Sequence, residues 1–168
     1  MTQLPLQKTW IRILLTLLTA AMMVVIFFFS SQNAEKSDQT SGRVSKVIVK
    51  VVHPEYEKST EEKKAEIFNG VQHAVRKTAH FSEYLALGIL LRLCLESWFG
   101  KRKFLFPAAW AGGTLYACTD ELHQMASDGR SAMWQDVLID SCGVLTGVAI
   151  ATLVLTLICR SLAHKEQK

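Results

Sequence analysis

Charged residues are missing from long stretches of this chain of 168 residues. None occurs from Ile13 to Ser31 or from Phe104 to Thr119, and the stretch from Val137 to Cys159 contains only Asp140. Each helix of a soluble protein needs a hydrated face, so charge normally interrupts its apolar stretches every few residues. These absences argue against a soluble globular domain and indicate a small integral membrane protein.

Several sequence motifs are also absent. The four cysteines form no CxxC pair, which argues against a disulfide scaffold and a thiolate zinc site. There is no HExxH metal motif and no GxSxG nucleophile motif. No internal repeat is visible, and the inverted repeats typical of transporters are missing. The 49% hydrophobic content excludes a disordered chain. We therefore expect no metal and no cofactor.

Four stretches have the length of membrane-spanning helices, which need about 20 mostly apolar residues. They are residues 10–29, 77–99, 104–119 and 136–159. The sequence thus predicts an all-α, polytopic membrane protein with four transmembrane helices. The first stretch also has features of a signal peptide, but its length and the poor cleavage site that follows it favour an uncleaved anchor. We expect Arg92, inside the second stretch, to extend toward the nearer membrane interface.

The polar segment 30–76, between the first two spans, is predicted to be helical. His53–Pro54 ends its first helix, because the residue before proline avoids the helical region. Ser59 or Thr60, followed by Glu61, indicates a new helix start. That second helix could continue through Asn69–Gly70 into the next span. In the first helix the apolar residues recur at the spacing of one helical face: Val44, Val47, Ile48, Val51 and Val52.

Basic residues in short loops predict the orientation of the spans. With four spans, the N-terminus (1–9), the loop 100–103 and the tail 160–168 lie on one side, which carries a net positive charge. The segment 30–76 and the loop 120–135 lie on the other side, which is net negative. Both termini are therefore predicted to be cytoplasmic, and 30–76 and 120–135 extracytoplasmic.

This topology brings three groups of polar residues to the extracytoplasmic surface. The groups are Arg76, Lys77, His80, Glu83 and Tyr84 at the start of the second span, Asp120, Glu121, His123 and Gln124 after the third, and Arg130, Asp136 and Asp140 at the start of the fourth. Arg76, His80 and Glu83 stand at i, i+4 and i+7, so they share one helical face. We therefore predict one functional cluster built from three segments.

Asp140 lies one turn inside an apolar span, where a charge is costly and indicates function. Its expected partner is Arg76 or Arg130, and a purely structural ion pair between helices remains an alternative. The stripe from Asp136 through Asp140 continues as Gly143 and Gly147, a small-xxx-small pattern that permits close helix approach. This stripe should therefore face the bundle. Two histidines and several carboxylates could bind a divalent metal, but no spacing matches a strong metal motif.

Two boxes in this chain resemble those of VanZ-like proteins. Residues 76–84 read RKTAHFSEY, similar to the family's RK-x-x-HF-x-EY box, and DELHQ at 120–124, GR at 129–130 and DVLID at 136–140 resemble its DE-x-HQ…GR…D-x-x-x-D box. The resemblance covers about residues 10–160. It implies a multi-pass protein of the bacterial cytoplasmic membrane, chiefly in Gram-positive bacteria, in a family associated with low-level teicoplanin resistance. The twelve polar residues of the predicted cluster match signature positions.

Two kinds of function fit these residues. In the first, a non-catalytic envelope protein binds or shields a lipid, a lipid-linked cell-wall precursor or teicoplanin at the membrane surface, without nucleic acid. Arg76, Lys77 and Arg130 would hold a phosphate or carboxylate. The remaining binding residues would be Tyr84, Glu121, Gln124 and Asp136.

In the second reading the chain is a membrane enzyme that acts on a lipid-linked or peptidoglycan substrate. His80 or His123 would serve as general base, because imidazole titrates near working pH. Glu83 or Asp120 would orient it, and an arginine would stabilise developing negative charge. The acid–base set would thus be His80, Glu83, Asp120, His123 and Asp140.

Overall fold

The computed structural model describes residues 5–31, 34–124 and 134–166, and every regular element in these ranges is a helix. The elements are the short 3-10 helices η1 (Pro5–Gln7) and η2 (Tyr56–Lys58) and the α-helices α1 (Thr9–Ser30), α2 (Ala34–Val52), α3 (Glu61–Phe99), α4 (Leu105–Gln124) and α5 (Trp134–Glu166). The prediction of an all-α protein is therefore confirmed for the described residues.

The longest helix of the described residues is α3, which has 39 residues. Its beginning is polar and its later part is apolar. It begins where the sequence predicts, since the Thr60 side chain accepts a hydrogen bond from the Lys63 backbone N–H. It runs without a break through Asn69 and Gly70 and ends at Phe99, where Gly100 follows with a φ of 65° that only glycine readily adopts. The helix predicted to start after Thr60 and the predicted span 77–99 are thus one continuous helix.

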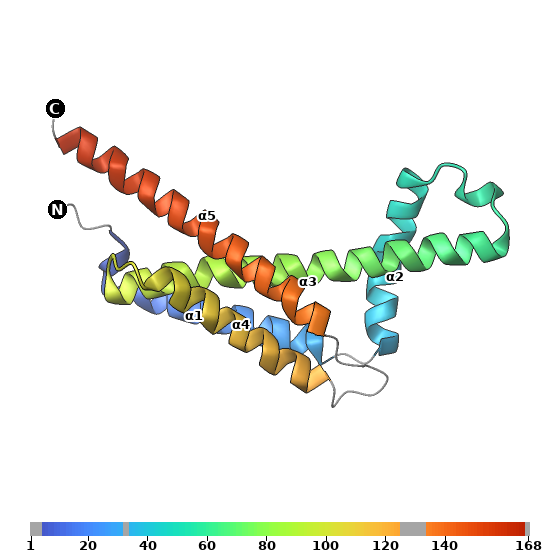
Figure 1. The fold of residues 1–168 in the computed structure, drawn as a ribbon, viewed down its shortest axis with the longest axis horizontal. Helices are drawn as coiled ribbons and strands as arrows, with labels where there is room; N and C mark the ends of the chain where they lie inside the picture. Colours follow the sequence, from blue (N-terminus) through green and yellow to red (C-terminus); the bar gives the residue numbers. More distant parts are fainter. Residues whose placement is uncertain (1–4, 32–33, 125–133, 167–168) are drawn as a thin grey trace.

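Four helices, α1, α3, α4 and α5, form a bundle in which each runs opposite to the one before it in the chain (Figure 1). α1 runs opposite to α3, because the Trp98 indole near the end of α3 donates to Thr16 near the start of α1. α4 runs with α1, since Tyr116 donates to the Met23 carbonyl and, further along both helices, His123 lies 3.2 Å from the Ser31 hydroxyl. The core joins all four helices and consists of Ile26, Tyr84, Leu87, Ala109, Ala117, Val144 and Val148.

α3 and α5 run in the same direction and cross at very short range. A Cβ added to Gly147 would lie 2.1 Å from the Leu85 carbonyl oxygen, and one added to Gly143 would lie 2.5 Å from that of Phe81. On the facing helix, a Cβ at Gly88 would lie 2.4 Å from the Val144 carbonyl oxygen. The small-xxx-small prediction for α5 is therefore confirmed, and the glycines fix the register of the two helices.

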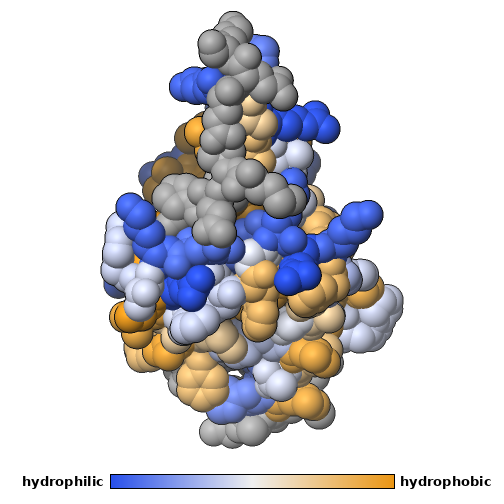
Figure 2. All heavy atoms as spheres, turned by 90° about the vertical axis from the view of Figure 1, so that its left-hand side faces the viewer, coloured by the Kyte–Doolittle hydropathy of each residue, from blue (hydrophilic) through white to orange (hydrophobic). Residues whose placement is uncertain are grey.

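The flanks of the bundle are apolar. Large apolar side chains are exposed along α1, α4 and α5, among them Leu17, Phe28, Leu115 and Leu153. Figure 2 views the end of the bundle where η1 and the C-terminal end of α5 lie: hydrophilic side chains form a band across it, with apolar side chains beside the band. Such exposure would be a liability in water and is typical of a surface that faces lipid.

Among the described residues, three helices are long and apolar enough to cross a membrane: α1, α3 and α5. The predicted span 104–119 corresponds to α4, which has 20 residues but is not one of the three. Its composition explains this, because Gly112, Gly113 and Thr114 occupy its middle and Asp120 and Glu121 its last turns. Composition alone therefore supports three spans, not the four predicted.

Arg92 does not extend toward an interface as the sequence suggested. Its guanidinium is buried, 2.7 Å from the Glu96 carboxylate, and it donates to the Thr152 hydroxyl of α5 at 3.1 Å. The i, i+4 spacing of opposite charges inside a span is the signal that would have revealed this pair. Arg92 therefore links α3 to α5 in the interior of the bundle.

Candidate functional site

The glycine crossing places polar residues of α3 directly against those of α5, at the end of the bundle away from η1. Lys77 forms an ion pair with Asp136, and both side chains are about four-fifths buried. One turn further along, His80 Nδ1 lies 3.8 Å from Asp140 Oδ1. The i, i+4 spacing of Asp136 and Asp140 thus meets a matching spacing of partners on α3.

Asp140 is only 2% exposed. This agrees with the prediction that the stripe of Asp136, Asp140, Gly143 and Gly147 faces the bundle. The sequence suggested Arg76 or Arg130 as its partner, whereas the structure places His80 beside it. Arg76 is half-buried and has interactions of its own. Arg130 lies outside the described residues.

α4 contributes a third set of polar groups. Asp120 is buried and accepts a hydrogen bond of 3.2 Å from the Gln124 side chain. It also interacts electrostatically with Glu83 and Tyr84 of α3 and with Asp140 of α5. Three helices therefore converge on one group of side chains, which we call the polar cluster: Lys77, His80, Glu83, Tyr84, Asp120, Asp136 and Asp140.

Two predicted residues of α4 take different positions. Glu121 is buried and contributes to the field at Asp140. His123 instead faces α1: its ring stacks on Phe27 with centroids 4.5 Å apart, and its Nε2 lies 3.2 Å from the Ser31 hydroxyl. The structure therefore does not bring the two predicted histidines together. The polar end of α1, Ser30–Ser31, was the only sequence signal for this contact.

The interior of the polar cluster is rich in carboxylates. Glu83, Asp120 and Asp140 lie close enough to repel one another, Lys77 is paired with Asp136, and the His80 ring lies beside Asp140. Asp120 Oδ1 and Asp140 Oδ1 are buried acceptors, and the Tyr84 hydroxyl, which can donate as well as accept, is buried next to Asp120. Buried polar atoms are normally satisfied, so this group has room for a further hydrogen-bond partner.

These side chains do not form an evident metal centre. Among the described residues, no three His, Cys, Asp or Glu side chains are arranged to hold a metal ion. The four cysteines are all free. The arrangement can instead accept hydrogen bonds from a bound group or transfer a proton through His80 and Asp140.

The fold and the polar cluster define a class: a helical membrane protein with ionisable residues gathered at one end of its bundle. Within that class the family can be named, because the VanZ/LLP1 family model matches residues 15–155. The chain belongs to this family. Comparison with curated proteins and with solved structures gives no match.

Proposed function

We propose that this VanZ-family chain is a multi-pass protein of the bacterial cell envelope whose polar cluster, on the extracytoplasmic face, binds a lipid or lipid-linked cell-wall component. The observation that carries the proposal is the convergence of buried acidic and basic side chains from α3, α4 and α5 at one end of an otherwise apolar bundle. Ionisable groups at membrane depth are energetically unfavourable, so their presence there indicates a functional role.

The chemistry of the polar cluster favours a head group rich in hydrogen-bond donors. The carboxylates of Glu83, Asp120 and Asp140 would accept bonds from hydroxyl, amide or ammonium groups, such as those of a sugar or peptide. A phosphate would be repelled from this interior. Arg76, which is half-buried and lies one turn before His80 on α3, would hold it instead, since a guanidinium binds phosphate oxygens bidentately.

The same site would account for a contribution to low-level teicoplanin resistance in a Gram-positive host. Covering or sequestering a wall precursor at the membrane surface would lower the amount that the antibiotic reaches. To test this, the chain and its variants are produced in a teicoplanin-sensitive Gram-positive strain, with membrane levels matched by immunoblot.

Asp140→Asn should abolish the protection, whereas Glu66→Gln, which removes an exposed carboxylate elsewhere on α3, should retain it. The purified protein in micelles should also retain a lipid-linked wall precursor in native mass spectrometry, and Asp140→Asn should not. Equal protection and equal binding by the two variants would refute the proposed site.

The proposal includes a four-span topology with both termini cytoplasmic. α4 supports it, because this helix lies parallel to α1 within the bundle and carries its acidic residues at the same end as the polar cluster. In a background without native cysteines, a cysteine replacing Glu62 should react with an impermeant thiol reagent in whole cells. One replacing Arg102 should react only after lysis, and the reverse pattern would invert the topology.

Enzymatic acid–base chemistry remains a second candidate, and the pairing of His80 with Asp140 favours it. A buried carboxylate that orients an imidazole is the arrangement of a general base. Incubation with lipid-linked wall precursors, followed by mass spectrometry, should then yield a product that His80→Gln does not form. A protein that binds the precursor but leaves it unchanged is a binding protein.

A further inference from the structure

α2 packs on α3 through a face that the valine pattern does not include. Its buried residues are Gly42 and, at i, i+4 and i+8, Ser41, Ser45 and Val49. The Gln72 side chain of α3 donates to the Ser41 hydroxyl at 3.1 Å, and Gly42 lies against Phe68. Small residues thus let α2 lie closely across α3 in the region of residues 68–72.

The four valines that the sequence places on one helical face are left uncovered, and Ile48 on the same face is half-buried. Val44, Val47, Val51 and Val52 are 49%, 66%, 75% and 59% exposed. A helix buries its apolar face wherever it can, because each exposed valine forgoes a favourable transfer out of water. The protein itself supplies no cover for this face among the described residues, which points to a partner outside the chain.

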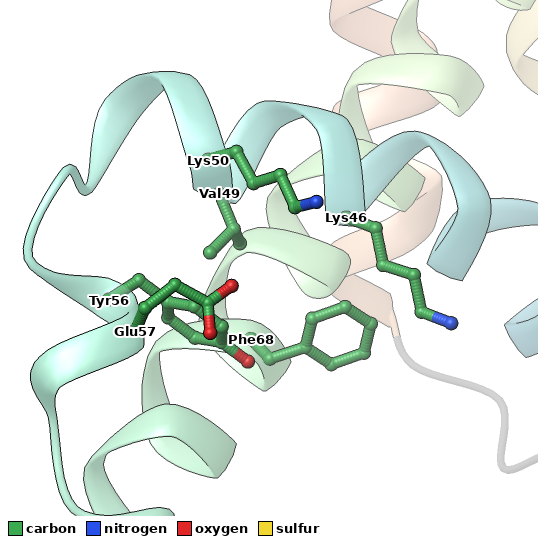
Figure 3. Close-up of a pocket in the computed structure, with 6 residues that line it drawn as sticks. All are labelled: Lys46, Val49, Lys50, Tyr56, Glu57 and Phe68. Atoms are coloured by element: carbon green, nitrogen blue, oxygen red, sulfur yellow. The ribbon is translucent and has the colours of Figure 1, made fainter.

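The opposite face of α2 shows which way the valines point. Lys46 and Lys50 line a pocket with Phe68 and with Tyr56 and Glu57 of η2, the segment that precedes α3 (Figure 3). Lys46 is separated from Val51 by five residues, or about 140° around the helix. The lysines therefore face the free end of α3, and the valines face the membrane-spanning part of the bundle.

The position of α2 along α3 corresponds to the surface of a bilayer. Gln72 precedes Lys77 by five residues, which is about 8 Å along a helix axis. The head-group region on each side of the hydrocarbon core is roughly 5–8 Å thick. Only three residues separate the end of α1 from the start of α2, so α2 stays at the level where α1 leaves the membrane, and it runs crosswise to the bundle (Figure 1).

We propose that α2 lies flat in the head-group region of the bilayer, with its valine face on the lipid chains and its lysines toward water. The face continues the apolar surface of the bundle at the same end, where Phe28 of α1 and Trp134 of α5 are exposed. A helix with an apolar face and lysines on its polar face is typical of an interfacial membrane helix. The proposal depends on neither the ligand of the polar cluster nor the side of the membrane.

Depth-dependent fluorescence quenching tests this placement on the full-length protein. In a background without native cysteines, single cysteines replace Val47 or Val51 on the valine face and Gln39 or Lys46 as matched controls on the polar face of the same helix. Each is labelled with the environment-sensitive NBD fluorophore, and the protein is reconstituted in vesicles of phosphatidylcholine and phosphatidylglycerol. Circular dichroism verifies the helix content of every labelled variant.

Labels at Val47→Cys and Val51→Cys should be quenched by phosphatidylcholine with a nitroxide on its acyl chain, and aqueous iodide should quench them severalfold less than the labels at Gln39→Cys and Lys46→Cys. Equal iodide quenching at all four positions would place the valines in water and overturn the proposal. Shielding of Val51→Cys from both quenchers would overturn it too: oxidative crosslinking of Val47→Cys would then identify a second copy of the chain as the cover.

Discussion

The crossing of α3 and α5 makes a quantitative prediction about Gly147. In Gly147→Ala the new Cβ would lie 2.1 Å from the Leu85 carbonyl oxygen and 2.9 Å from the Ile89 nitrogen. Ordinary contact requires about 3.5 Å, so the helices must separate by roughly 1 Å or more. Both contacts are backbone atoms, which cannot move aside as a flexible side chain can.

Overpacking of this kind costs about 1–3 kcal/mol. Gly112→Ala is the matched control, because a Cβ at Gly112 meets nothing within 4 Å. There the substitution removes the conformational freedom of glycine and stabilises the helix by up to about 1 kcal/mol. The two alanine variants should therefore differ in free energy of unfolding by about 1–4 kcal/mol, with Gly147→Ala the less stable.

The assay is reversible unfolding of the purified protein in mixed micelles, monitored by circular dichroism as the fraction of denaturing detergent rises. Gly147→Ala should also lose protection against teicoplanin, since separation of the helices moves Asp140 away from His80. If Gly147→Ala proves as stable as Gly112→Ala, the close crossing and the register derived from it are wrong.

Two further predictions use the same unfolding assay. Arg92→Met should lower the free energy of unfolding by about 3–5 kcal/mol, because it leaves the buried Glu96 carboxylate unpaired. Adding Glu96→Met should recover most of the loss. A double variant as unstable as the single one would refute the pairing. His123→Phe should keep the stacking on Phe27 and lose only the contact with Ser31, a cost of about 0.5–1.5 kcal/mol, while teicoplanin protection persists; loss of protection in a folded protein would assign His123 to the site.

The local features of the chain were predictable because they depend on neighbours in the sequence. Thr60 followed by Glu61 predicts the start of α3, and His53–Pro54 the end of α2, as observed. The i, i+4 spacing of Asp136 and Asp140 predicts that both lie on one face of α5. Gly143 predicts that this face packs against another helix, which is α3 in the structure. Periodicity is sufficient for these conclusions, since a helix fixes the relative directions of its own side chains.

The choice of partner between helices was not predictable in the same way. Asp140 lies beside His80, a neighbour that the sequence did not suggest, and His123 turns to α1. Both outcomes depend on how far each helix is rotated and shifted against the next, which the glycines of α3 and α5 and the small residues of α4 determine together. A one-residue shift would change every such pair.

The sequence alone established the helical class, the uncharged stretches that mark a membrane protein and the two boxes that indicate the VanZ/LLP1 family. Only the tertiary structure decided which carboxylates share the polar cluster and that the valines of α2 are left facing outward. The physical reason is the same in both cases. Hydrophobic periodicity identifies an apolar face, but close packing of Ser41 and Ser45 on α3 decided which face of α2 the protein buries and which it leaves for the membrane.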